Sequence, residues 1–101
     1  MNGSPRRPIR PKILREAVGS FNVVEVSGHA QARMRQRGIT ERQVLTALRG
    51  PDGNLPADPG RKRIFRNLNN RVAVVVVYQE RTDRIAVITT YRRQRKTGSK
   101  R

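Results

Sequence analysis

Five side chains in two short segments have the chemistry and the spacing of a phosphate site. His29, Arg33 and Arg37 recur at every fourth residue, so they line one side of a helix. Thr89 and Tyr91 are two residues apart near the end of a predicted strand, so they project from one face of it. An imidazole can transfer a proton, guanidinium groups neutralise phosphate charge, and hydroxyl groups donate hydrogen bonds to phosphate oxygens. Together they predict a site that clamps a scissile phosphate.

Each of these patterns also has an ordinary structural explanation. A cationic stripe on a helix is usually a solvated face, and a single histidine is more often structural than catalytic. Threonine is common in strands, and a tyrosine often covers the edge of a core. A site is favoured by the position of His29, the only histidine, in the first helical turn, where a helix attracts anions. Arg92 and Arg93, directly after the strand, add positive charge.

Several other chemistries lack the residues that they need. The chain has no cysteine, which excludes disulfides, thiol chemistry and zinc sites built on thiolates. Its seven acidic residues are scattered, whereas a metal-dependent nuclease needs clustered carboxylates. It has no glycine-rich phosphate loop, and its aromatic residues are too few for the stacking platform of an RNA-binding sheet. We therefore expect no metal and no small-molecule cofactor.

The charge of the chain indicates a polyanionic partner. Lysine and arginine number 23 against 7 acidic residues, which gives a net charge of +16 over 101 residues. Residues 1–12 and 92–101 hold basic residues and no acidic ones, which predicts phosphate contacts that weaken with salt. Nucleic acid is the first candidate partner, and an acidic protein is the second.

A membrane is a less suitable polyanion for this chain. The basic ends lack the bulky apolar residues of an amphipathic anchor. No apolar run approaches the roughly 20 residues that span a bilayer, and the N-terminus lacks the apolar stretch of a secretory signal. We expect a cytoplasmic protein that does not bind a membrane.

The patterns predict a single domain over residues 13–93, between a flexible basic arm (1–12) and a flexible basic tail (94–101). The predicted elements are a helical turn or two at 13–18, a strand at 21–26, helices at 29–37 and 41–49, a loop at 51–60, and strands at 62–68, 72–78 and 85–91. For the first helix, Ser27 is the expected N-cap and Gly38 the expected stop. For the second, Thr40 and Gln43 form a capping box.

The predicted fold class is α+β. One short N-terminal strand is followed by two helices and then by a three-stranded antiparallel meander, with both helices packed on one face of the sheet. The strand at 72–78 is apolar on both faces, so we expect it at the centre. In the last strand, strict alternation predicts that Ile85 and Val87 share a face with Thr89 and Tyr91.

Two segments carry the signature of a family. The sequence of residues 28–39 is GHAQARMRQRGI, and that of residues 87–92 is VITTYR. Over about residues 24–93 the chain resembles a small bacterial domain family with the pattern HAxxRMxxRGI, similar in organisation to the BrnT and RelE toxins of the barnase-like and colicin-type ribonuclease grouping. The resemblance implies a RelE-like fold, metal-independent cleavage of RNA, and an acidic antitoxin or immunity protein as partner.

The resemblance also implies roles for individual residues. The implied catalytic residues are His29, Arg33, Thr89 and Tyr91, and Arg63 or Arg66 would join them from the first strand of the meander. Together with the basic residues of the helix stripe and the strand end, this gives the expected nucleic-acid-binding residues: Arg37, Arg63, Arg66, Arg92 and Arg93. No glutamate is placed to act as a barnase-like base, so His29 would have to carry proton transfer.

The expected function is that of a small endoribonuclease, the toxin of a toxin–antitoxin or polymorphic-toxin system. An RNA 2′-hydroxyl would attack the adjacent phosphate and leave a 2′,3′-cyclic phosphate. Two alternatives stay open: a noncatalytic nucleic-acid-binding module that uses the same basic surface, and a toxin that acts on a protein target such as gyrase. Both are compatible with the same fold, because a fold does not determine an activity.

Overall fold

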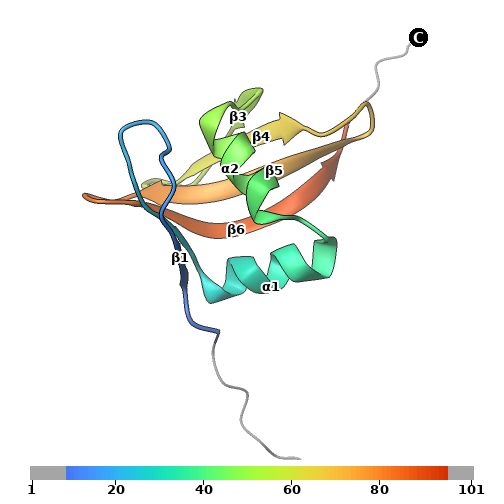
Figure 1. Cartoon of the computed structure of the whole chain (residues 1–101). Helices are drawn as coiled ribbons and strands as arrows, with labels where there is room; N and C mark the ends of the chain where they lie inside the picture. Colours follow the sequence, from blue (N-terminus) through green and yellow to red (C-terminus); the bar gives the residue numbers. More distant parts are fainter. Residues whose placement is uncertain (1–8, 96–101) are drawn as a thin grey trace, which may run out of the picture.

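The computed structural model describes residues 9–95, so most of the predicted arm and tail lies outside the described residues. In chain order the elements are β1 (Lys12–Leu14), β2 (Val24–Val26), α1 (Gly28–Arg37), α2 (Glu41–Arg49), β3 (Gly53–Leu55), β4 (Lys62–Asn67), β5 (Val72–Glu80) and β6 (Ile85–Gln94). The mixed α+β class is confirmed (Figure 1). Neither α1 nor α2 is long and apolar enough to cross a membrane.

The strands form one six-stranded sheet in the order β1-β2-β6-β5-β4-β3. Four of the five pairings are antiparallel, and β2 joins β6 in parallel. The apolar strand β5 lies between β4 and β6, as predicted, and both of its edges are hydrogen-bonded to these neighbours.

Both helices begin and end where their capping residues predict. The Ser27 hydroxyl accepts a hydrogen bond from the backbone N–H of Ala30 at 3.0 Å, and Gly38 ends α1 with a φ of 65°, which favours glycine. The capping box of α2 is complete: Thr40 and Gln43 each accept a hydrogen bond from the other's backbone N–H.

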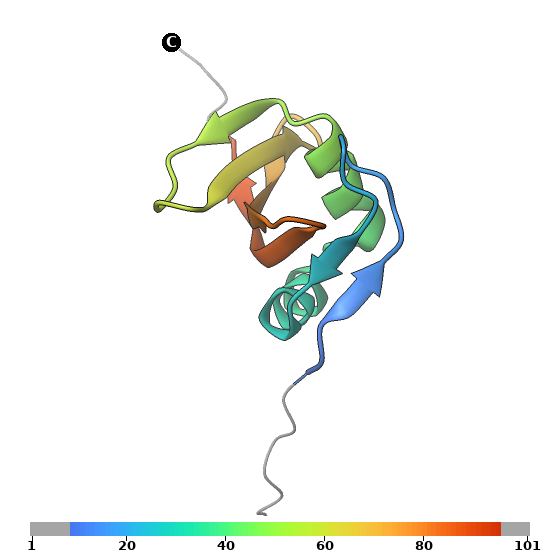
Figure 2. The ribbon, with the colours of Figure 1, turned by 90° about the vertical axis from the view of Figure 1, so that its left-hand side faces the viewer.

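The two helices cover one face of the sheet. Ala30 and Met34 of α1 are buried in the same core as Val74 and Val76 of β5, and α2 contacts β4 and β5. Side chains alternate along a strand, so the odd-numbered residues of this part of β5 point to the opposite face. Among the described residues no helix covers that opposite face, here called the open face (Figure 2).

Three segments differ from the prediction, and together they turn a meander into a larger sheet. Residues 13–18 hold no helical turn, because pairing of β1 with β2 satisfies backbone groups that so short a helix would leave exposed. The strand predicted at 21–26 forms only at Val24–Val26. The loop predicted at 51–60 contains β3, which pairs with β4 through residues that include no proline. A RelE-like topology stays a prediction.

A β-bulge corrects the predicted faces of the last strand. Val77 pairs with Thr89, whereas the next residue, Tyr78, pairs with Val87, so Ile88 is an extra residue in β6. The bulge turns the second half of the strand over. Val87 is buried against the helices, and Thr89 points to the open face, whereas strict alternation would have placed both on one face.

The bulge is held by the start of α1. Besides capping the helix, the Ser27 hydroxyl donates a hydrogen bond to the carbonyl oxygen of Ile88 at 3.0 Å. In the second half of the strand, Thr90 is buried and pairs with the core residue Val76, so it faces the helices. Its hydroxyl donates a hydrogen bond to the carbonyl oxygen of Val75 at 2.7 Å. Its two neighbours, Thr89 and Tyr91, therefore lie on the open face.

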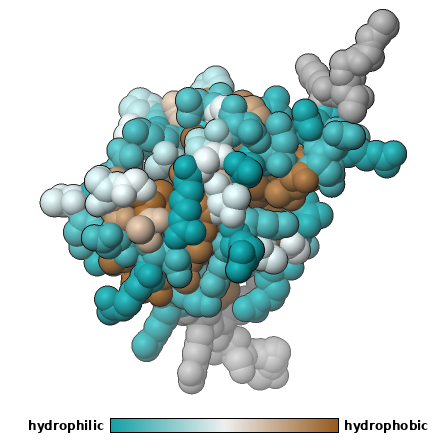
Figure 3. Space-filling view, turned by 45° about the horizontal axis from the view of Figure 1, so that its top comes forward, coloured by the Kyte–Doolittle hydropathy of each residue, from teal (hydrophilic) through white to brown (hydrophobic). Residues whose placement is uncertain are grey.

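The face of the molecule shown in Figure 3 is largely hydrophilic. When the top of Figure 1 is tilted forward, hydrophilic residues cover most of the visible face, with hydrophobic residues in patches between them (Figure 3). At the N-terminal edge, Lys12 of β1 forms an ion pair with Glu41 at the start of α2. Most of the buried apolar residues lie in the core between the helices and the sheet.

Candidate functional site

The open face is built in rows, because residues that pair across neighbouring strands project side by side. Across β4, β5 and β6 the rows are Arg63–Val77–Thr89, Phe65–Val75–Tyr91 and Asn67–Ala73–Arg93. Small or apolar residues of β5 form the middle of each row, and polar or aromatic residues stand on both sides. The face is therefore lower at β5 than at β4 and β6.

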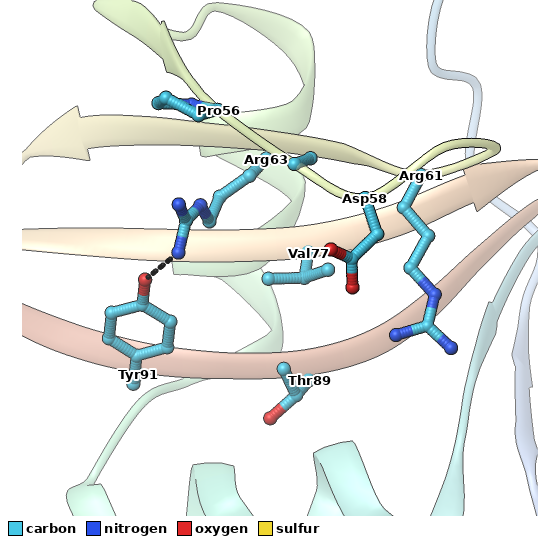
Figure 4. A pocket seen from close by; sticks show the side chains of 8 residues that line it. Pro56, Asp58, Arg61, Arg63, Val77, Thr89 and Tyr91 are labelled. Carbon is cyan, nitrogen blue, oxygen red and sulfur yellow. Dashed lines mark hydrogen bonds between the residues drawn. The ribbon is translucent and has the colours of Figure 1, made fainter.

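A cavity of about 470 Å³ lies over the first of these rows. This cavity, the Arg63 hollow, is lined by Pro56, Ala57, Asp58, Arg61, Arg63, Val77, Thr89 and Tyr91. Figure 4 views it from the open face, with α2 behind the strands. The sheet forms the floor, and the loop between β3 and β4 forms one wall.

Arg63 and Tyr91 are joined across the hollow. A terminal nitrogen of Arg63 (Nη1) donates a hydrogen bond to the phenol oxygen of Tyr91 at 3.2 Å (Figure 4). Because the phenol oxygen accepts this bond, the hydrogen of the Tyr91 hydroxyl is free to be donated to a ligand. The Nε of Arg63 is buried and has no hydrogen-bond partner among residues 9–95.

The loop between β3 and β4 adds two charged groups of opposite sign. The side chains of Asp58 and Arg61 reach from the loop over β5 toward Thr89 (Figure 4). The loop is shaped by a hydrogen bond from the N–H of Arg61 to the carbonyl oxygen of Asp58 at 3.0 Å and by Gly60, whose φ is 80°. A carboxylate thus lies among two guanidinium groups and two hydroxyl groups.

Asp58 and Arg61 were missed as site residues when the sequence alone was considered. Asp58 lies in the segment 51–60, which has three prolines and two glycines and was predicted to be a loop, and Arg61 directly follows it. A loop prediction gives no direction for side chains. The missing signal was the short strand β3: once β3 and β4 are recognised as a hairpin, the residues that connect them must lie at the end of β4, close to Arg63.

The structure brings some of the predicted residues together and leaves others apart. Thr89, Tyr91 and Arg63 line one hollow. No residue of α1 belongs to that lining: His29 is exposed in the first turn of the helix, and Arg33 donates to the side-chain oxygen of Gln36 at 3.1 Å. Catalytic roles for His29 and Arg33 stay predictions, as does nucleic-acid binding by the exposed Arg37 on the same helix.

Two of the predicted binding arginines contact helix ends. Arg66 donates to the carbonyl oxygen of Gly50 at 2.6 Å, and Arg92 donates to the carbonyl oxygen of Gly38 at 3.1 Å. These carbonyls lie at the C-terminal ends of α2 and α1, where a cation is favourable. Arg93 instead lies on the open face, where it lines a second hollow of about 300 Å³.

Charged groups at the other end of the sheet have a structural role. The side-chain hydrogen bond from Arg84 lowers the pKa of Asp83, and Arg84 also bridges to Glu25 of β2 at 3.0 Å. On β5, burial raises the pKa of Tyr78. Within residues 9–95 there is no group of three His, Cys, Asp or Glu residues that could hold a metal ion.

Comparison with known proteins gives one match. The model of a protein family described as a domain of unknown function (DUF4258) matches residues 26–92, which include both helices and every residue that lines the Arg63 hollow. No curated protein and no solved structure matches the chain. The predicted relationship to the BrnT and RelE toxins stays a prediction.

Proposed function

This chain belongs to the DUF4258 family, described as a domain of unknown function, and from its own site geometry we propose that it is a metal-independent endoribonuclease whose active site is the Arg63 hollow. The observation that carries the proposal is the hydrogen-bonded pair Arg63–Tyr91 in a cavity that also holds the Asp58 carboxylate. Binding of a polyanion fits the net charge of +16.

The hollow has the groups that hold a phosphodiester. Arg61 and Arg63 would neutralise the phosphate and the further charge that develops on it in the transition state. The terminal nitrogens of Arg63 would donate to a phosphate oxygen, and the Thr89 hydroxyl would donate from the β6 side.

The same hollow has groups that can move the two protons of the reaction. The RNA 2′-hydroxyl would give its proton to the Asp58 carboxylate as its oxygen forms a bond to phosphorus. The bond from phosphorus to the 5′-oxygen would break, and that oxygen would take the hydrogen of the Tyr91 hydroxyl. The products are a 2′,3′-cyclic phosphate and a 5′-hydroxyl end, with no water consumed.

This assignment differs from the sequence-based expectation that His29 transfers the proton. One pair of variants, Asp58→Asn and His29→Ala, distinguishes the two assignments of the proton acceptor. Asp58→Asn keeps the shape of the side chain but cannot accept the proton, so we expect cleavage to fall by about 10²–10⁴-fold. His29→Ala should leave cleavage within a few-fold of the wild type, because His29 does not line the hollow.

The test uses the full chain and single-stranded RNA in buffer with EDTA. We expect cleavage products that end in a 2′,3′-cyclic phosphate, and we expect Tyr91→Phe to slow their formation. Intact RNA at high protein concentration, with binding that weakens as salt is added, would contradict cleavage and favour the noncatalytic binding module. Loss of activity in His29→Ala but not in Asp58→Asn would mean that His29 of α1, and not Asp58, transfers the proton.

The biological setting we propose is that of a toxin restrained by an acidic antitoxin or immunity protein, which would cover the open face and its arginines. Growth arrest on expression that disappears in Asp58→Asn would support this role. Growth arrest with cellular RNA intact would favour a protein target such as gyrase.

A further inference from the structure

The second hollow of the open face combines one aromatic ring with amide and guanidinium groups. This hollow, the Phe65 hollow, has a volume of about 300 Å³ and is lined by Phe65, Asn67, Ala73, Arg93, Gln94 and Arg95. None of these residues is needed for the cleavage step proposed above. Their chemistry therefore calls for an explanation of its own.

The ring of Phe65 is fixed against the neighbouring strand. Phe65 pairs with Gly53 of β3, and a Cβ atom added to Gly53 would lie 2.6 Å from the ring atom Cε1. The ring therefore packs on the bare backbone of the glycine. It is half-buried, and it contributes a rigid apolar surface to an otherwise polar hollow. Such a surface is what a nucleobase stacks on.

The rest of the hollow has groups that suit a nucleotide. Ala73 lies between Asn67 and Arg93 in the register, and its small side chain leaves space over β5. The amides of Asn67 and Gln94 each offer a donor and an acceptor to the edge of a base. Arg93 is exposed and positively charged, and it can contact the phosphate attached to that base.

The two hollows are adjacent along the strands. Tyr91 lines the Arg63 hollow and Phe65 lines the Phe65 hollow, and the two rings stand on either side of Val75 in the middle row. The first and third rows are four residues apart, so their centres lie about 13 Å from each other along the sheet. An extended nucleic acid strand can place a phosphate in one hollow and a nearby base in the other.

We propose that the Phe65 hollow is a nucleobase subsite that takes one unpaired base of the RNA strand whose phosphate lies in the Arg63 hollow. The identity of the ligand rests on the proposed function. A base inside a duplex has both faces stacked on its neighbours and offers none to the ring, so the substrate class is single-stranded RNA. The chain has too few aromatic residues for a platform that stacks several bases, and one ring serves one base.

The test measures binding apart from cleavage. The probe is a fluorescein-labelled, single-stranded RNA oligonucleotide with every 2′-hydroxyl methylated, so that it cannot be cleaved, and the readout is fluorescence anisotropy. We expect Phe65→Leu to weaken binding about tenfold. Phe65→Tyr keeps the ring and should bind like the wild type. The matched control is Phe21→Leu, because Phe21 packs against the core on the covered side.

Duplex RNA of the same sequence provides the second arm. The wild type should prefer the single strand, and Phe65→Leu should lose most of that preference while keeping its duplex binding. If Phe65→Leu fails to fold by circular dichroism, Arg93→Gln replaces it. Because Arg93 is exposed, this substitution should leave the fold intact. It should weaken binding of the single strand and reduce the slope of log affinity against log salt concentration by about one.

The outcomes separate this proposal from the previous one. Equal binding of both strand forms, or wild-type binding by Phe65→Leu, would overturn the subsite even if the protein cleaves RNA. Ring-dependent binding of the single strand without any cleavage would support the subsite and overturn the ribonuclease.

Discussion

The two faces of the central sheet share three strands but serve different purposes. On the covered face, Val74 and Val76 of β5 lie in the core beneath α1 and α2. On the open face, Val77 of β5 lies in the floor of the hollow, between Arg63 on β4 and Thr89 on β6. Alternation along a strand thus places stability and chemistry one residue apart. Neighbouring substitutions should therefore have separable effects.

Deleting Ile88 should have the largest effect. Without the extra residue, either Thr89 and Tyr91 turn into the core or Val87 turns out of it, because a shift by one residue exchanges the faces. We expect the free energy of unfolding to fall by about 4 kcal/mol or more, measured by urea denaturation. Ile88→Ala keeps the register and should cost far less. A deletion variant as stable as the wild type would mean that the bulge does not assign the faces.

The next largest effect comes from a matched pair on β4. Arg63→Gln should lower the rate of RNA cleavage about 100-fold, because it removes a donor from the proposed site, and should change thermal stability little. Arg66→Gln should leave cleavage unchanged but lower the free energy of unfolding by about 1.5 kcal/mol, because it removes a charged hydrogen bond to the end of α2. Loss of cleavage in Arg66→Gln together with loss of stability in Arg63→Gln would contradict this division between the two faces.

Two adjacent threonines give a finer version of the same comparison. Thr90→Val removes a buried hydrogen bond to Val75 and should cost about 1 kcal/mol of stability, measured by thermal denaturation. Thr89→Val should leave stability unchanged and slow RNA cleavage about tenfold, the effect of one lost hydrogen bond. If both changes affect only stability, Thr89 does not contact the substrate.

The smallest effect concerns the ion pairs at the far end of the sheet. Because the folded state lowers the pKa of Asp83 below its ordinary value of 3.8, ionised Asp83 stabilises the fold at and above that pH. This stabilisation is lost as the pH falls through the lowered pKa. The difference in melting temperature between wild type and Asp83→Asn should therefore be small and constant from pH 7 to about pH 4, and should vanish in stronger acid. If the difference in melting temperature persists in stronger acid, ionisation of Asp83 is not its cause.

The sequence predicted the parts of this fold that depend on local patterns. Ser27, Gly38 and the capping box at Thr40 fixed the ends of both helices, because capping depends on residues within one turn. The central place of β5 was also predicted from a local pattern, because its run of apolar residues lies within one short segment. The strands β1 and β3 were missed because each has only three residues, too few for a pattern, and each forms only by pairing with a partner.

The candidate site was predicted in part. Alternation in β6 put Thr89 and Tyr91 on one face, and both do line one hollow with Arg63. Alternation alone could not predict which face, because the bulge depends on how β6 pairs with β5 and on Ser27 of a distant segment. Asp58 was not predicted because its place is determined by the hairpin of β3 and β4, which appears only in three dimensions.

The position of β6 has a consequence for how the protein is made. It is the last strand along the described chain, yet it lies between β2 and β5 and joins the two ends of the sheet. A ribosome synthesises β6 after every other element of the domain, so β2 has no partner on that side until translation reaches Ile85. A chain truncated before Ile85 should show no cooperative melting. The growing polypeptide therefore lacks the Arg63 hollow for most of its synthesis, because Thr89 and Tyr91 reach their places only when β6 pairs with β5.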